Sequence, residues 1–400
     1  MKKSAFITLL IVVSASALAE TRALLRVSAL SSNAPSFQSN DISHQRFDGK
    51  HFALSQAVID TSLLIGNNWQ VHAVANAYSD GEQQLGISQL YLKYRPLVAS
   101  TLKPEVRIGA FYPSLSAENT ALGWLSPHFL SNSAINSWIG EELRVGGVEA
   151  SIRQNGRQVN SPWSWKLLGS VFKGNDTTGT LVAWRGFALH DRQSLYNERV
   201  NFLPIPWVVS EEGFNAPAWT EPFREIDKRF GYYIGGHAAY KRQYEVKYYF
   251  YDNRADPKVL DIDRLYAWRT RFHSFTFKQQ PSANITVFAQ AMAGNTIMGD
   301  NIVNNDFYSA FLATAYTVGS FTHSARVDWY HVIDKDEQPN DPNASQGQAI
   351  TINTRYQIND YASVSGEWQW NNGRQANLAF FQPTDAFTEN TIQLAFTLMY

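Results

Sequence analysis

The chain has 400 residues, no cysteine and a formal net charge of −1, so disulfides do not stabilise it and nothing suggests nucleic-acid binding. Aromatic residues make up 14% of the chain, and the mean hydropathy is −0.29. After residue 19 no stretch approaches 18 consecutive apolar residues, which excludes a helical membrane protein.

The first residues have the pattern of a cleaved export signal. Two lysines precede an apolar run over 5–13, and Ala17-Leu18-Ala19 provides a small-x-small cleavage site. The apolar run is too short to remain as a membrane-spanning helix. We therefore predict a signal peptide at 1–19 and an exported mature chain at 20–400.

The last nine residues alternate as a strand does when lipid covers one face. The residues on that face are Ile392, Leu394, Phe396, Leu398 and Tyr400. This face has no charge and ends in an aromatic residue, which suits the rim of a transmembrane barrel. The stretch resembles the C-terminal signature of bacterial outer-membrane proteins, which the barrel-assembly machinery recognises.

Alternating segments recur along the whole mature chain and are joined in turn by short and long connections, such as Lys241-Arg242 and 333–347. The predicted strands are 22–29, 53–65, 69–78, 86–95, 104–111, 143–153, 163–173, 229–240, 243–252, 264–277, 284–293, 307–317, 321–332, 348–358, 362–371 and 389–400. We predict an all-β fold, a transmembrane antiparallel up-and-down β-barrel with short periplasmic turns and long extracellular loops. Sixteen strands are preferred because an even count keeps both chain ends periplasmic; eighteen would need a hidden strand near 199–209.

Charged residues within the strands are assigned to the lumen, because an Arg or Lys facing lipid costs about 2–4 kcal/mol at the bilayer midplane. The predicted inward cations are Arg22, Arg26, Lys93, Arg95, Arg107, Arg153, Lys166, Arg229, Lys247, Arg269, Arg271, Arg326 and Arg355. The predicted inward anions are Asp60, Glu105, Glu149, Glu245, Asp328 and Glu367. The excess of cations predicts a modest anion preference, with Arg269, Arg271 and His273 as a basic row. Alternatively, many of these arginines pair with carboxylates and stiffen the wall.

The third external loop, 112–142, contains much apolar surface, so it must pack against something. If it folds into the barrel, it narrows the pore as a constriction loop. The loop residues brought toward the basic wall would be Glu118, His128, Glu141 and Glu142. The alternative places this loop over the mouth or against a neighbouring subunit. The stretch 174–228 is predicted as one folded external loop.

These features together resemble Gram-negative outer-membrane porins across the whole mature chain, and the basic lumen is similar to that of anion- or phosphate-selective porins. The resemblance implies an outer-membrane location, contact with lipid and lipopolysaccharide, a homotrimer, and passive diffusion of small polar or anionic solutes through a water-filled channel. A plugged or structural barrel acting as an adhesin is the alternative.

Enzyme and metal motifs are weak. The chain has no Gly-x-Ser-x-Gly, and His190, Asp191 and Ser194 are the nearest approach to a hydrolase set. The acidic run 334–341 lacks the glycine and the terminal glutamate of an EF-hand. We expect no enzymatic activity, no metal and no cofactor.

Overall fold

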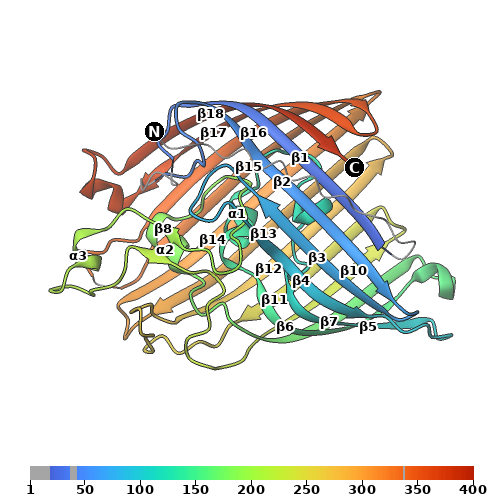
Figure 1. Ribbon diagram of the computed structural model, residues 1–400, viewed down its shortest axis with the longest axis horizontal. Helices are drawn as coiled ribbons and strands as arrows, with labels where there is room; N and C mark the ends of the chain where they lie inside the picture. The colour runs from blue at the N-terminus through green and yellow to red at the C-terminus, as the bar shows by residue number, and fades with distance from the viewer. Residues whose placement is uncertain (1–18, 37–42, 337) are drawn as a thin grey trace.

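The structure, a computed structural model, describes residues 19–36, 43–336 and 338–400, so the predicted signal peptide lies outside the described residues except for its last residue. The described residues form a closed antiparallel barrel of sixteen strands in which β1 also pairs with β18 (Figure 1). The sixteen-strand prediction is confirmed. The eighteen-strand alternative is wrong, because the short strands β8 and β9 form a separate sheet.

The barrel strands are β1 (Ala19–Ser32), β2 (Lys50–Ile65), β3 (Trp69–Ala77), β4 (Leu85–Tyr94), β5 (Leu102–Phe111), β6 (Val145–Gln154), β7 (Trp163–Lys173), β10 (Gly231–Tyr240), β11 (Tyr244–Asp252), β12 (Trp268–Ser282), β13 (Ile285–Met298), β14 (Val303–Val318), β15 (Phe321–Asp334), β16 (Ser345–Asn359), β17 (Ala362–Gln375) and β18 (Ala386–Met399). The connections also contain η2 (Leu122–Trp124), α1 (Ala134–Glu142), η3 (Gly156–Val159), α2 (Thr180–Arg185), β8 (Val200–Asn201), α3 (Pro206–Val209), β9 (Trp219–Thr220) and η4 (Ala376–Phe380). No helix in the described part of the chain is long and apolar enough to cross a bilayer.

Short turns close one end of the barrel, here called the short-turn end. Between β10 and β11, Lys241 and Arg242 both have positive φ (48° and 61°), and Gln243 N donates to Tyr240 O at 3.0 Å. Two left-handed residues give the turn a twist that matches the flanking strands, so residues 241–243 are enough to connect the paired Tyr240 and Tyr244. The opposite, long-loop end holds the connections 112–133 and 186–230.

The outer face of the wall is apolar, as the alternation predicts. On β18 the exposed fractions of Ile392, Leu394 and Leu398 are 61%, 57% and 42%, whereas Ala395 and Thr397 between them are buried. On β16, Ile350 and Ile352 are exposed, and Thr351 and Asn353 are buried. Apolar residues face outward on these strands because lipid covers the outer face, and the alternating polar residues therefore face inward.

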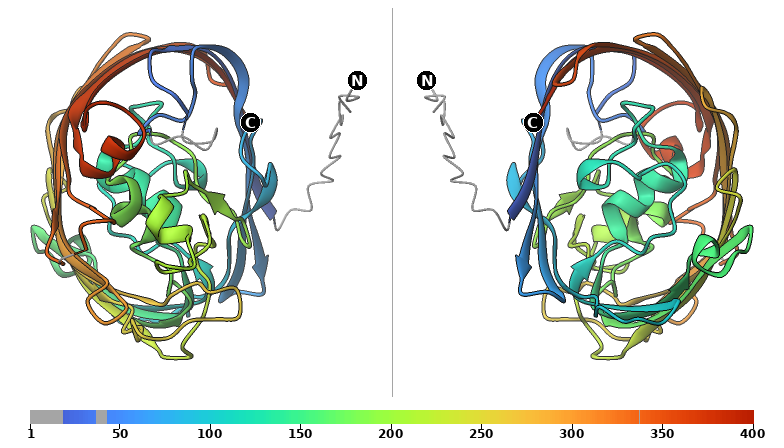
Figure 2. Two further views of the ribbon diagram at one scale, coloured as in Figure 1. Left: turned by 90° about the vertical axis from the view of Figure 1, so that its left-hand side faces the viewer. Right: turned by 90° about the vertical axis from the view of Figure 1, so that its right-hand side faces the viewer.

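The interior contains a hydrophobic core of its own. Looking along the barrel, Figure 2 shows the helical segments α1 and α2 within the ring of strands. The Trp138 ring of α1 lies 5.6 Å from the Phe272 ring and 5.2 Å from the Phe307 ring, both of which belong to the wall. Phe187 lies 6.2 Å from Phe307 and 6.1 Å from Tyr330. The inner face of these strands is therefore aromatic where it packs against loops.

The long connection after β7 is only partly external. Val182, Phe187 and Leu189 are buried in the same cluster as Trp138, so the segment around α2 lies inside the barrel. The prediction that all of 174–228 is external is therefore wrong. The segment around α2 enters the lumen for the same reason as loop 112–142: its apolar residues are removed from water there.

Candidate functional site

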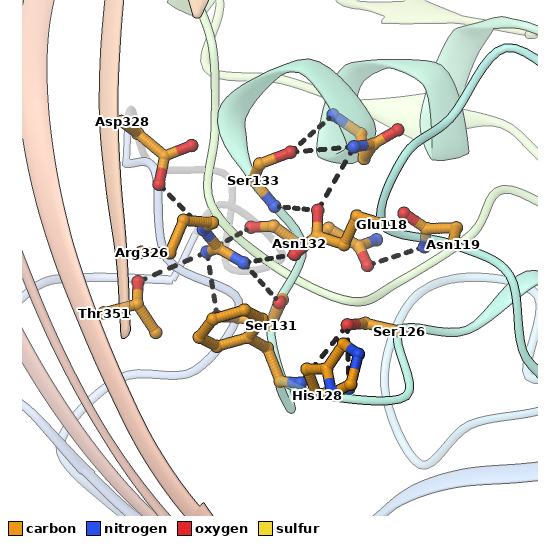
Figure 3. A network of polar contacts seen from close by, with 12 residues as sticks. Glu118, Asn119, Ser126, His128, Ser131, Asn132, Ser133, Arg326, Asp328 and Thr351 are labelled. Atoms are coloured by element: carbon orange, nitrogen blue, oxygen red, sulfur yellow. Dashed lines mark hydrogen bonds and ion pairs between the residues drawn. The ribbon is translucent and has the colours of Figure 1, made fainter. Parts of the chain in front are cut away.

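The inner loop, residues 112–144, occupies the middle of the lumen and is fixed there by wall residues. Arg326 of β15 is fully buried and pairs with Glu118 of the loop and, from Nε to Oδ2 at 2.8 Å, with Asp328 (Figure 3). Its Nη atoms donate to the carbonyl oxygens of Ser131 at 3.0 Å and Asn132 at 2.9 Å. One wall guanidinium thus binds two separate parts of the loop.

Wall carboxylates hold the same loop through its backbone. Asp328 Oδ1 accepts from Ala134 N at 3.0 Å, at the start of α1. Glu367 of β17 accepts from Leu130 N at 2.7 Å and from Ser131 N at 2.9 Å. Hydrogen bonds to charged groups are the stronger kind, so this loop has one defined position.

The inner loop is tied in turn to α2. The Glu142 carboxylate accepts from Trp138 Nε1 at 2.6 Å, Gly179 N at 3.0 Å and Leu181 N at 2.9 Å. Burial raises the pKa of Glu142 to about 7, against the opposing effect of these hydrogen bonds. Its neighbour Glu141 pairs with Arg185 and His190. Burial opposes ionisation of Glu141 too, but its interactions with Arg185 and His190 outweigh that effect and lower the pKa of Glu141 to about 2.

We expect the Glu142 carboxyl to make folding stability depend on pH. Its folded pKa lies above the ordinary value of 4.5, so its contribution is fully present below about pH 4.5 and is lost as pH rises through about 7. Urea unfolding at pH 5 and pH 8 measures the effect, and Glu142→Gln should flatten the difference. An unchanged pH dependence in that variant would contradict the assignment.

Most predicted lumen residues lie on the inner face. These are Arg26, Lys93, Arg95, Arg107, Lys247, Arg326, Arg355 and Glu367. Several are paired there: Arg107 Nη2 lies 2.7 Å from Glu149 Oε2, and Arg95 Nη2 lies 2.9 Å from Glu105 Oε2. Lys247 Nζ donates to Ser116 O of the inner loop at 3.1 Å.

The inward assignment of Arg269, Arg271 and His273 is wrong. The residues of β12 that face inward are Trp268, Thr270, Phe272, Ser274 and Thr276, all buried. Thr276 Oγ1 donates to Leu115 O of the inner loop at 2.9 Å, which fixes this register. The basic row occupies the outer face toward the long-loop end, where Arg269 contacts Asp252 at 3.5 Å. The same parity places Lys278, which the sequence reasoning missed, on the inner face opposite Glu245.

The predicted constriction residues are inside the barrel but do not form an open acidic edge. Glu118 is neutralised by Arg326, Glu141 by Arg185, and Glu142 is enclosed between α1 and α2. His128 lines a cavity of about 180 Å³. Burial, with Arg355 and Lys278 nearby, lowers the pKa of His128 to about 4, so it is neutral at pH 7.

A cavity of about 600 Å³ opens at the short-turn end between β5, β6, β7, β10 and β11. The charged residues of its lining are Arg95, Lys103, Arg153, Lys166 and Glu245. Lys166 lies 3.8 Å from Glu149, and Arg153 has no ion pair within the described chain. This basic vestibule, defined by these five residues, carries an excess of positive charge.

Two smaller cavities follow the wall on the other side of the inner loop. One, of about 180 Å³, is lined by Arg26 and Arg355; the other, of about 30 Å³, is lined by Asp191 and Glu367. Hydrogen bonds from Leu130 N and Asn353 Nδ2 to Glu367 join their linings. The inner loop fills much of the lumen here, so both cavities have smaller volumes than the roughly 300–1,000 Å³ of a drug-sized pocket.

Two of the three residues nearest to a hydrolase set, His190 and Asp191, pair with other side chains. His190 pairs with Glu141, and Asp191 Oδ1 lies 2.7 Å from Arg46 Nη1. The Ser194 carbonyl accepts from Arg144 Nη2 at 2.6 Å. Arg46, Arg144 and Arg192 are buried loop arginines that were not predicted from the sequence. Aromatic residues next to them, such as Phe47 beside Arg46, could have indicated that they are buried.

No protein-family model matches the chain, and no curated protein sequence matches it. Among solved structures, the chain is similar to the outer membrane channel DcaP of Acinetobacter baumannii, with a TM-score of 0.58 and 11% identity over 96% of this chain and 97% of that one. It is also similar to the trimer form of OmpT of Vibrio cholerae (TM-score 0.54, 8% identity, 96% and 99%). A third is the anion-selective porin from Comamonas acidovorans (TM-score 0.51, 10% identity, 96% and 99%). The chain has the fold of Gram-negative outer-membrane porins.

Proposed function

We propose that this chain is an outer-membrane porin with a narrow, water-filled channel for passive diffusion of small polar solutes, and that it prefers anions. The basic vestibule carries the proposal, because a cleft lined mainly by one sign of charge concentrates ions of the other sign. The inner loop supports a narrow rather than a wide channel, since wall residues Arg326 and Glu367 fix it across the lumen.

The same proposal includes the chain's surroundings. The exposed apolar outer face fits contact with outer-membrane lipid and, toward the long-loop end, with lipopolysaccharide. We infer export by a cleaved signal and assembly as a homotrimer, for which the trimer form of the structurally similar OmpT is the support. No enzymatic role is proposed.

A second candidate, a plugged barrel with a structural or adhesive role, is favoured by one observation. The interior holds an apolar cluster that includes Trp138, Phe187 and Phe307, which is more typical of a packed core than of a wide aqueous lumen. The two candidates differ in whether ions cross the protein.

Recording from planar bilayers distinguishes them. We expect stable current steps after insertion and, in a KCl gradient, a reversal potential whose sign shows chloride passing more readily than potassium. The preference should weaken at high salt, because exposed charge is screened over about 8 Å at physiological ionic strength and over less above it. Insertion without current would support the plugged barrel, and a cation-selective current would refute the anion preference.

A further inference from the structure

We propose that the cavity between the inner loop and strands β1 and β16–β18 binds a small carboxylate with an apolar body. We call it the seam cavity; its volume is about 180 Å³, and Arg26 and Arg355 line it. The inference rests on the proposed channel function, because it names a solute class and a binding site within that channel.

Arg355 supplies positive charge that the protein leaves uncompensated, whereas Arg26 already has partners. Within the described chain, Arg355 has no ion pair and no hydrogen bond from its guanidinium. Arg26 is buried; it lies 3.6 Å from Asp191, and its Nε donates to Thr397 Oγ1 at 3.4 Å. The other oxygen of Asp191 lies 2.7 Å from Arg46, which also pairs with Asp80. A charge in such a site is costly unless it is paired, so an anion entering the cavity gains a partner that the chain does not provide.

The polar side of the seam cavity suits a carboxylate. A guanidinium presents paired donors that match the two oxygens of a carboxylate. The hydroxyl groups of Ser363, Ser365 and Thr397 lie in the same lining and can donate to an oxygen. His128 Nδ1 has no hydrogen-bond partner among the described residues, and the side chain is neutral at pH 7 because the pKa is about 4. A neutral imidazole adds a further polar contact.

Apolar residues in the same lining disfavour a ligand that is polar all round. They are Leu24, Leu122, Leu125, Phe129 and Met399, and all of them except Phe129 belong to one hydrophobic cluster. Phosphate or sulfate would leave oxygens against this apolar wall without donors, which is unfavourable. A carboxylate with a ring or a short chain places its apolar part there instead. The volume lies below the range of about 300–1,000 Å³ typical of drug-sized ligands, so the ligand is compact.

Titration calorimetry on the folded, detergent-purified protein tests the inference, with sodium benzoate as the probe and benzamide, sodium acetate and inorganic phosphate as comparisons. We expect saturable benzoate binding that is about tenfold or more tighter than binding of any comparison compound, as one charge-assisted contact or one buried ring provides. Arg355→Gln should weaken benzoate binding about tenfold. Arg269→Gln, on the outer face, is the matched control and should change nothing.

Leu122→Gln is the second variant; it should weaken benzoate binding while leaving acetate unchanged, because only benzoate reaches the apolar wall. If phosphate bound as tightly as benzoate, the site would not require an apolar body in its ligand. If benzamide bound as tightly as benzoate, the site would not require a carboxylate. Binding in detergent needs no conductance. Arg355-dependent binding without channel current would therefore refute the proposed function and support the binding site. Current without saturable benzoate binding would support the proposed function and refute the binding site.

Discussion

Replacing Arg326 by methionine should destabilise the barrel interior by about 3–5 kcal/mol, the usual cost of breaking a buried ion pair from one side. The change removes the partner of Glu118 and Asp328, which are fully buried and would remain as two adjacent, uncompensated carboxyl groups. It also removes the donors to the Ser131 and Asn132 carbonyls. Urea unfolding followed by tryptophan fluorescence measures the loss.

Arg374→Met is the matched control. Arg374 also pairs with a carboxylate, Asp385, at 3.0 Å, but its side chain is 64% exposed. An exposed pair of this kind contributes about 0–1 kcal/mol, so the control should unfold close to the wild type. If both variants unfolded alike, the Arg326 network would not be what fixes the inner loop. Current recordings on the Arg326 variant that still folds should show noisier and larger steps, because the loop is no longer held.

Neutralising the basic vestibule should remove most of the anion preference. In the double variant Arg153→Gln with Lys166→Gln, the lining keeps Arg95 and Lys103 against Glu245, and Glu149 keeps its pair with Arg107. We expect the chloride-to-potassium permeability ratio to fall toward unity, because a cleft with less excess positive charge concentrates chloride less. Reversal potentials at low salt measure it.

The control for this prediction is Arg269→Gln with Arg271→Gln. It removes the same number of positive charges from the outer face of β12, where no permeating ion passes. Its permeability ratio should equal that of the wild type. A larger change in the control than in the vestibule variant would mean that the path of the ions lies elsewhere.

Alternation along the strands predicted the wall well because lipid imposes a simple rule on it. Ile392, Leu394 and Leu398 on β18 and Ile350 and Ile352 on β16 lie outside as expected, and the even strand count follows from the same pattern. The inner loop was also foreseen, because apolar residues such as Trp138 cannot remain in water.

Strand β12 shows where that rule stops. Alternation places charged residues inward when water fills the lumen and lipid covers the outside. On β12, however, Phe272 faces inward because it packs against the aromatic ring of Trp138 inside the barrel. Near the rim the penalty for an outward charge falls to about 0–1 kcal/mol, so Arg269 and Arg271 can face outward. Pairings such as Arg326 with Glu118 join residues 208 positions apart, and the sequence has no local pattern that specifies them.

The inner loop also spans the junction at which the barrel closes. Strands β1 and β18 are the first and the last barrel strands in the sequence, and they meet along Leu24–Ser32 and Thr391–Met399. On one side of this junction Asp60 of β2 accepts from Gly123 N at 3.1 Å, and on the other Glu367 of β17 accepts from Ser131 N. The loop therefore ties together the strands on both sides of the junction. A shortened loop should weaken the closure of the barrel and not simply widen the channel.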